Sequence, residues 1–209
     1  MMASFLASLI IYFRPVWTHR YLLFFPPFLL ATVVIEAWGS YQYSRGQNNL
    51  AVYNFFTVIE FCFYLWALAT IIHNNFARRV IYILMVAYAV ASTVNILFYQ
   101  GLHTFHTITY ALGCLLIAGV CVYYFLELFR LPKSIGLINN PAFWICSGLL
   151  FYYCCGFPLF ALINQWQEIS PLIVESFVSI VTILNIFLYS LFTIAFLCMI
   201  TRKYISSRS

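Results

Sequence analysis

The segment from Leu50 to Ile72 reads LAVYNFFTVIEFCFYLWALATII, and Glu60 is its only charged side chain. A helix needs roughly 20 apolar residues to cross the hydrocarbon core of a bilayer, and this segment is long enough. A surface helix of a soluble protein would carry a polar face toward water, which this segment lacks. It therefore predicts a transmembrane helix with an acid near its middle.

The rest of the chain has the same character. Of its 209 residues, 65% are apolar, 21% are aromatic and only 7% are charged, and the mean hydropathy is +0.95. A soluble domain carries roughly 25% charged residues, so this composition excludes one. Ten scattered basic residues form no stripe that would bind nucleic acid. Six apolar runs reach spanning length, namely Tyr21 to Gly39, Leu50 to Ile72, Val80 to Tyr99, Phe105 to Phe129, Pro141 to Ile163 and Leu172 to Thr201.

These runs predict an all-α, polytopic transmembrane helical bundle that forms a single domain over residues 1–209. A shorter run, Ala3 to Phe13, leaves the helix count open. It is a short first span, an interfacial helix, or part of a span that starts upstream of Met1. We expect seven helices if it spans, which we favour, and six if it does not. Pro26 and Pro27 predict a kink or a discontinuous helix early in the first long run.

Basic residues alternate between the segments that join the runs. Nine of the ten basic residues fall in every second segment, a set that includes the C-terminal tail. Only Arg45 falls in the other set of segments. Positive charge stays on the cytoplasmic side during insertion. We therefore expect the C-terminus and the basic loops to lie inside, in a bacterial inner membrane, in contact with membrane lipids.

Two acids fall within predicted spans. The chain has no Asp, and Glu36 and Glu60 lie about 22 Å and 15 Å from the starts of their runs, at 1.5 Å per residue. An ionisable group at helix centre costs roughly 2.5–3.5 kcal/mol or more, so we expect both carboxyls to be protonated. They are our first candidates for ligand or proton binding. The alternative is that each is a neutral acid hydrogen-bonded to a neighbouring helix.

Other polar side chains gather on the predicted outer side. Asn95, His106, Glu175 and Asn185, together with the two acids, are expected to line a cavity that opens outward. His103, His106, Glu168 and Glu175 carry suitable atoms for a transition metal, but their spacing has no metal signature. We predict no metal, no cofactor and no catalytic residues.

Glu127 and Arg130 lie three residues apart at a predicted cytoplasmic helix end. This is the spacing of a local ion pair on a helix surface, and we interpret the pair as structural.

Two stretches carry a resemblance to a known family. They are YNFFTVIEF, from Tyr53 to Phe61, and the segment that opens with Asn140, Pro141 and Ala142 and ends with Tyr152 and Tyr153. They resemble a family of small, functionally uncharacterised multi-spanning membrane proteins of Bacteroidota. The resemblance runs from about Tyr21 onward and implies association with sensor kinase systems. It implies no activity. It supports the interpretation of Glu60 as a feature of that family.

These observations favour a non-catalytic sensory or signalling module. It would bind a small or lipophilic ligand, or protons, in an outer-half cavity and act on a cytoplasmic or membrane partner. A proton-coupled transporter or permease, a structural scaffold of a membrane complex and a membrane enzyme acting on lipid remain alternatives. The sequence leaves the ligand, the partner and the oligomeric state open.

Overall fold

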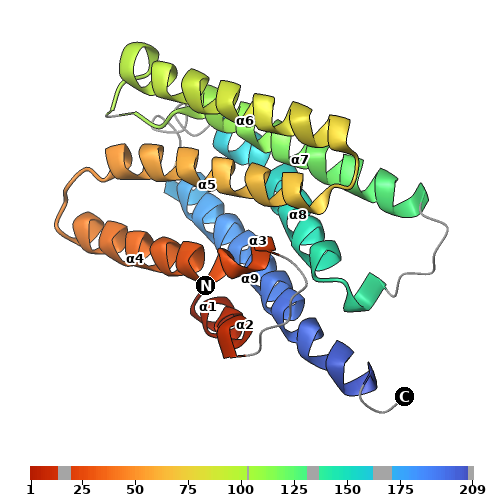
Figure 1. Cartoon of the computed structure of the whole chain (residues 1–209). Coiled ribbons are helices and arrows are strands. Elements are labelled where there is room, and N and C mark those ends of the chain that lie inside the picture. Colours follow the sequence, from red (N-terminus) through yellow and green to blue (C-terminus); the bar gives the residue numbers. More distant parts are fainter. Residues whose placement is uncertain (14–19, 103, 131–136, 162–170, 207–209) are drawn as a thin grey trace.

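The computed structural model describes residues 1–13, 20–102, 104–130, 137–161 and 171–206, and in these ranges all regular structure is helical. The elements are α1 (Met2–Ser8), α2 (Ile10–Phe13), α3 (Arg20–Leu23), α4 (Phe25–Ser44), α5 (Leu50–Ile71), α6 (Asn75–Val94), the π-helix η1 (Asn95–Tyr99), α7 (Thr107–Arg130), the 3₁₀-helix η2 (Leu137–Asn139), α8 (Pro141–Ala161) and α9 (Pro171–Ser206) (Figure 1). Six of the stretches they form are long and apolar enough to cross a membrane: Tyr21–Ser44, Leu50–Ile71, Asn75–Tyr99, Thr107–Arg130, Pro141–Ala161 and Glu175–Cys198. The predicted all-α membrane bundle is confirmed.

The N-terminal run forms a seventh, shorter helical element. The apolar helix Met2–Tyr12 is shorter than the six spans and rises roughly 16 Å, about half the thickness of the hydrocarbon core. It packs against α9 and α4. The bundle therefore consists of six long helices and one short one.

The first long run is interrupted where its prolines lie. α3 ends at Leu23 and α4 begins at Phe25, with Pro26 and Pro27 in its first turn. Proline has no backbone N–H to continue a helix but suits a first helical turn. The ladder resumes where the N–H of Phe28 donates to the carbonyl of Phe24 at 3.2 Å. The prolines therefore coincide with a one-residue break at Phe24, whose backbone keeps right-handed helical angles within the span Tyr21–Ser44.

α5 is the most enclosed of the long helices. Of its most apolar stretch 56% is buried, against 28–39% for the other five spans. Its fully buried Phe61 meets the rings of Tyr88 on α6, Tyr110 on α7 and Tyr153 on α8 at 5.1–5.4 Å between centroids. Gly113 of α7 makes room for this ring, because a Cβ there would lie 2.7 Å from Phe61 Cε1. An acid on α5 is therefore held among several helices.

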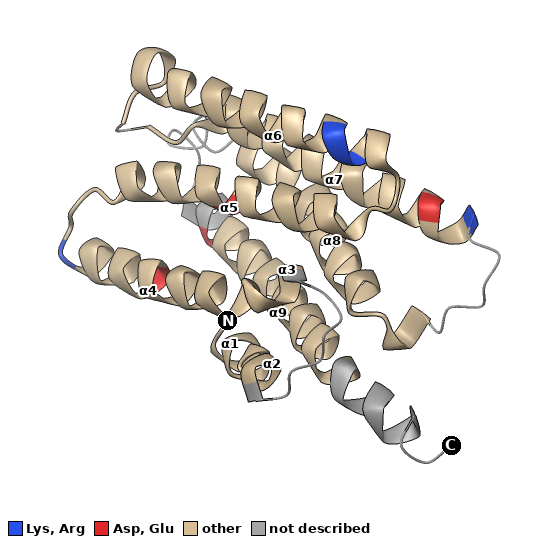
Figure 2. Ribbon diagram, in the orientation of Figure 1, with Lys and Arg blue, Asp and Glu red and all other residues tan. Residues whose placement is uncertain are grey.

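Charged residues lie mostly at the ends of the helices (Figure 2). Arg78 and Arg79 near the start of α6 and Arg130 at the end of α7 share one end of the bundle, whereas Arg45 follows α4 at the opposite end. The helices alternate in direction between these ends (Figure 1). This arrangement agrees with the alternation of basic segments, and the assignment of the basic end to the cytoplasm remains a prediction.

Candidate functional site

Glu60 lies in the middle of α5 and is half-buried. Its carboxyl is within electrostatic range of Glu36 on α4 and of Tyr64, one turn further along the helix, whose buried hydroxyl has no hydrogen-bond partner among the described residues. Two adjacent helices thus each bring one acid into the same part of the bundle.

Six tyrosines on five helices lie within electrostatic range of this acid. All of the following are within electrostatic range of the Glu60 carboxyl: Tyr64 on α5, Tyr88 on α6, Tyr110 on α7, Tyr152 and Tyr153 on α8, and Tyr189 on α9. A phenol both donates and accepts a hydrogen bond, so such groups can stabilise a carboxyl in either protonation state. We call Glu60, Glu36 and these six tyrosines the acid–tyrosine cluster.

Glu36 has a direct partner on α5. The hydroxyl of Tyr53 donates to Glu36 Oε2 at 3.4 Å, a long hydrogen bond. Gly39, one turn after Glu36, leaves the space that Tyr53 occupies, since a Cβ at this position would overlap the tyrosine ring. The carbonyl of Gly39 also accepts from Asn49 Nδ2 at 3.0 Å. These contacts hold α4 against the start of α5.

Asn95 and His106 meet through one hydroxyl. Asn95 Nδ2 donates to Thr109 Oγ1 at 3.2 Å, and His106 Nδ1 lies 2.8 Å from the same oxygen. Asn95 also donates to Gln100 Oε1 at 2.6 Å. Asn54 of α5 joins them, because its amide donates to the carbonyl of Thr104 at 2.8 Å and accepts from the N–H of His106 at 3.4 Å. We call these side chains the polar end network.

The π-helix η1 positions Asn95 for this contact. η1 continues α6 from Asn95 to Tyr99, and the N–H of Gln100 reaches back to the carbonyl of Asn95 at 2.9 Å. π-helical turns are rare and often lie at functional sites. Here the wider turn holds Asn95 in a buried position between α6 and α7.

The polar end network lies one helical turn from the acid–tyrosine cluster. The rings of His106 and Tyr110 are 6.3 Å apart between centroids, and Tyr110 in turn belongs to the cluster. The two groups of side chains therefore meet at the ring contact between His106 and Tyr110.

His106 provides a pH-dependent prediction. It precedes the α7 span, is fully buried, and its Nε2 has no hydrogen-bond partner among the described residues. Burial lowers the pKa of His106 from 6.5 to about 4. The unfolded chain therefore binds this proton more readily, and stability falls as the pH drops below 6.5. Between pH 8 and pH 5 we expect His106 to reduce the free energy of unfolding by about 2 kcal/mol.

Reversible unfolding in mixed micelles at a series of pH values tests this. The variant His106→Gln should lose most of the slope between pH 6.5 and pH 4. An unchanged slope in the variant would show that other groups cause the acid destabilisation.

The two remaining predicted residues lie on α9. Asn185 is half-buried, one turn before Tyr189 of the acid–tyrosine cluster, whereas Glu175 is exposed at the start of the span. The structure therefore brings Glu36 and Glu60 together, brings Asn95 and His106 together, and places Asn185 beside the first group. Glu175 is in neither group.

No group of three His, Cys or Glu side chains that could hold a metal occurs among the residues described. His103 and Glu168, two of the four residues considered for a metal, lie outside the described residues. Sequence reasoning missed the six tyrosines, Asn54 and Thr109. The two stretches that carry the family resemblance contain Asn54, Tyr152 and Tyr153, and nothing in the sequence signalled the others.

The fold and the acids at membrane depth define a polytopic integral membrane protein. Comparisons with protein-family models, with curated proteins and with solved structures found no match to this chain.

Proposed function

We propose that the protein is a non-catalytic sensory module of the bacterial inner membrane, in which a proton or a small ligand acts at Glu60. The observation that carries this proposal is the position of Glu60 on the most enclosed helix, within electrostatic range of Glu36 and of tyrosines from five helices. A change of charge at this one carboxyl acts on α4, α6, α7, α8 and α9 at once.

The mechanism is a shift between two packed arrangements. A neutral Glu60 is compatible with an apolar bundle, whereas an ionised one requires the surrounding phenols to turn their hydroxyl groups toward it. A ligand shifts such an equilibrium by as much as it prefers one arrangement over the other. The polar end network provides the route by which a proton or ligand reaches the interior, and the basic end of the bundle faces the cytoplasmic partner.

The test is a titration of the protein in nanodiscs. Infrared difference spectra report the protonated carboxyl, and fluorescence reports the chain's five tryptophans, among them Trp66, which lies on α5 beyond Glu60. We expect a coupled change in both signals with pH, and its loss in Glu60→Gln. The matched control is Glu175→Gln, which makes the same chemical change at the exposed acid of α9.

Three outcomes separate the possibilities. A response lost only in Glu60→Gln supports the sensory proposal. A response identical in the wild type and Glu60→Gln contradicts it and favours a scaffold. Net proton flux through the reconstituted wild type, blocked by Glu60→Gln, would instead indicate a transporter.

A further inference from the structure

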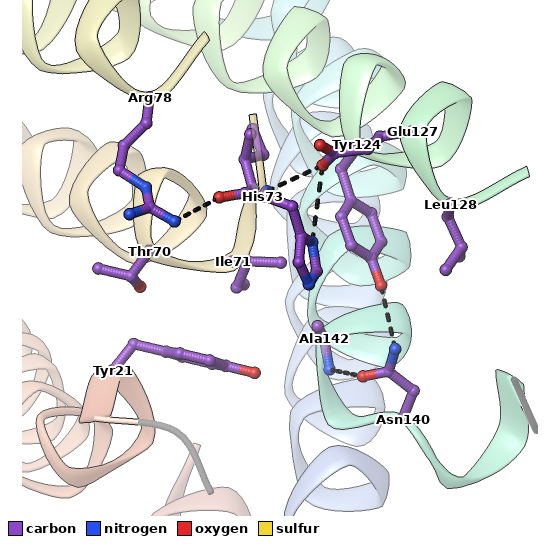
Figure 3. A pocket seen from close by; sticks show the side chains of 11 residues that line it. Tyr21, Thr70, Ile71, His73, Arg78, Tyr124, Glu127, Leu128, Asn140 and Ala142 are labelled. Atoms are coloured by element: carbon purple, nitrogen blue, oxygen red, sulfur yellow. Dashed lines mark hydrogen bonds and ion pairs between the residues drawn. The ribbon is translucent and has the colours of Figure 1, made fainter. Parts of the chain in front are cut away.

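A pocket of about 300 Å³ lies at the basic end of the bundle, away from the acid–tyrosine cluster. Residues at the end of α5, the start of α6, the end of α7 and the start of α8 line it, and Tyr21 of α3 closes one side (Figure 3). Its volume is at the lower end of the range for small-molecule sites. Because four spans end or begin here, the pocket lies at the level of lipid headgroups.

Arg78 forms one wall of this pocket. Its Nε donates to the carbonyl of Ala69 at 3.1 Å and its Nη2 to that of Ile72 at 2.8 Å. These two bonds satisfy carbonyls in the last turn of α5 and hold the guanidinium in place. An arginine has five N–H donors, so most of them are left for a ligand.

The other polar groups of the pocket also have hydrogen-bond donors to offer. Tyr124 Oη accepts from Asn140 Nδ2 at 3.4 Å, which leaves the phenol proton to donate. The imidazole of His73 is 77% exposed at the rim. Glu127 is the one acid of the pocket, and its two carboxylate oxygens accept from the N–H groups of His73 at 3.1 Å and Asn74 at 2.9 Å. The unused hydrogen-bonding groups of the pocket are therefore mainly donors, and an anion can accept hydrogen bonds from them.

A separate apolar groove of about 440 Å³ lies on neighbouring turns of two of the elements that line the pocket. Phe24, Phe28, Phe63 and Trp66 line this groove. Trp66 lies one turn before Thr70 of the pocket wall, and Phe24 lies three residues after Tyr21. Residues three or four apart share a helix face, which places the groove close to the pocket on its membrane-interior side.

We propose that the pocket binds the phosphate group of a membrane lipid, with part of an acyl chain in the aromatic groove. Arg78, Tyr124 and Asn140 contact the phosphate. Arg79 and Arg130 at the same end of the bundle raise the local concentration of anionic headgroups. A free phosphate shares the headgroup chemistry, but the groove favours a lipid. This inference does not depend on the function proposed for Glu60.

The test uses the full chain in detergent with three additives: dioctanoyl phosphatidylglycerol, dioctanoylglycerol, which has the same chains without phosphate, and inorganic phosphate. A ligand that binds the folded state raises the melting temperature in a saturable way. We expect phosphatidylglycerol to do so most strongly. Arg78→Gln should weaken its apparent affinity about tenfold, the size of one charge-assisted hydrogen bond. Arg79→Gln, which removes the same charge next to the pocket, should change it less than about twofold.

Tyr124→Phe keeps the test valid if Arg78→Gln fails to fold. It leaves both bonds of Arg78 in place and should weaken phosphatidylglycerol about threefold through the lost donor. Equal binding of dioctanoylglycerol would overturn phosphate recognition, as would equal losses in Arg78→Gln and Arg79→Gln. If inorganic phosphate binds as tightly as the lipid, the lipid assignment is overturned.

Discussion

Replacing Phe61 by alanine is expected to lower the free energy of unfolding by about 3 kcal/mol, the lower end of the range for buried Phe→Ala changes. The ring is fully buried and meets Tyr88, Tyr110 and Tyr153 from three other helices. Inside a membrane the lipid is as apolar as the protein interior, so the loss comes from packing and from the cavity rather than from transfer out of water. Unfolding by steric trapping in bicelles measures it.

Phe55→Ala is the matched control, because Phe55 is on the same helix but 44% exposed on its surface. Lipid fills the space that this side chain leaves, and we expect a loss below about 1 kcal/mol. If the two alanine variants lost equal stability, the central role of Phe61 would be refuted.

Gly113 gives the same contact a second test. A methyl group at this position would meet the ring of Phe61 at 2.7–3.0 Å, so Gly113→Ala should destabilise the wild type by about 1 to 2 kcal/mol. In the Phe61→Ala background the methyl enters the cavity instead, and we expect it to be neutral or stabilising. The interaction energy of this double-mutant cycle should therefore be large and favourable.

Replacing Glu127 by alanine is the second large change, with an expected loss of about 2 to 3 kcal/mol. The Glu127 carboxylate accepts two backbone hydrogen bonds from the turn between α5 and α6, at 3.1 Å and 2.9 Å. Hydrogen bonds to charged groups contribute about 1.5–3 kcal/mol each, and water recovers part of this at an exposed turn. Glu127→Gln keeps one acceptor oxygen and should lose about half as much.

Arg130→Ala separates this explanation from the local ion pair that the spacing had suggested. Among the described side chains no ion pair joins Glu127 to Arg130; the carboxylate instead reaches the turn, where His73 Nδ1 lies 3.9 Å away. Arg130→Ala should therefore cost less than about 0.5 kcal/mol. A loss of stability as large as that of Glu127→Ala would instead support the local ion pair between Glu127 and Arg130.

The apolar runs predicted the helices well wherever the apolar composition alone determines where a helix begins and ends. The run Leu50 to Ile72 corresponds to α5, Leu50–Ile71. The run that began at Val80 was too short, because α6 begins at Asn75. Asn74 caps that helix by accepting from the N–H of Phe76 at 2.9 Å, and Arg78 and Arg79 lie within its first turns. Counting apolar residues misses a helix end that is polar because it reaches the headgroups.

The surroundings of Glu60 could not be predicted in the same way. In a soluble protein the polar face of a helix reveals which side is buried, but lipid and protein interior are equally apolar. The sequence of α5 therefore does not distinguish Phe61, which is fully buried, from Ile59, which is 61% exposed. The tyrosines near Glu60 come from other helices, and only the packing of those helices brings them together.

The contact of Glu127 with the turn between α5 and α6 can form only late in the synthesis of this part of the chain. Glu127 lies 54 residues after His73, the first of the two residues whose N–H groups it binds. A ribosome adds about 5–20 residues per second, so the turn between α5 and α6 is synthesised roughly 3 to 11 s before its acceptor. During that interval water or lipid headgroups must solvate the two amides. The turn therefore gains its two carboxylate hydrogen bonds only after α7 has been synthesised.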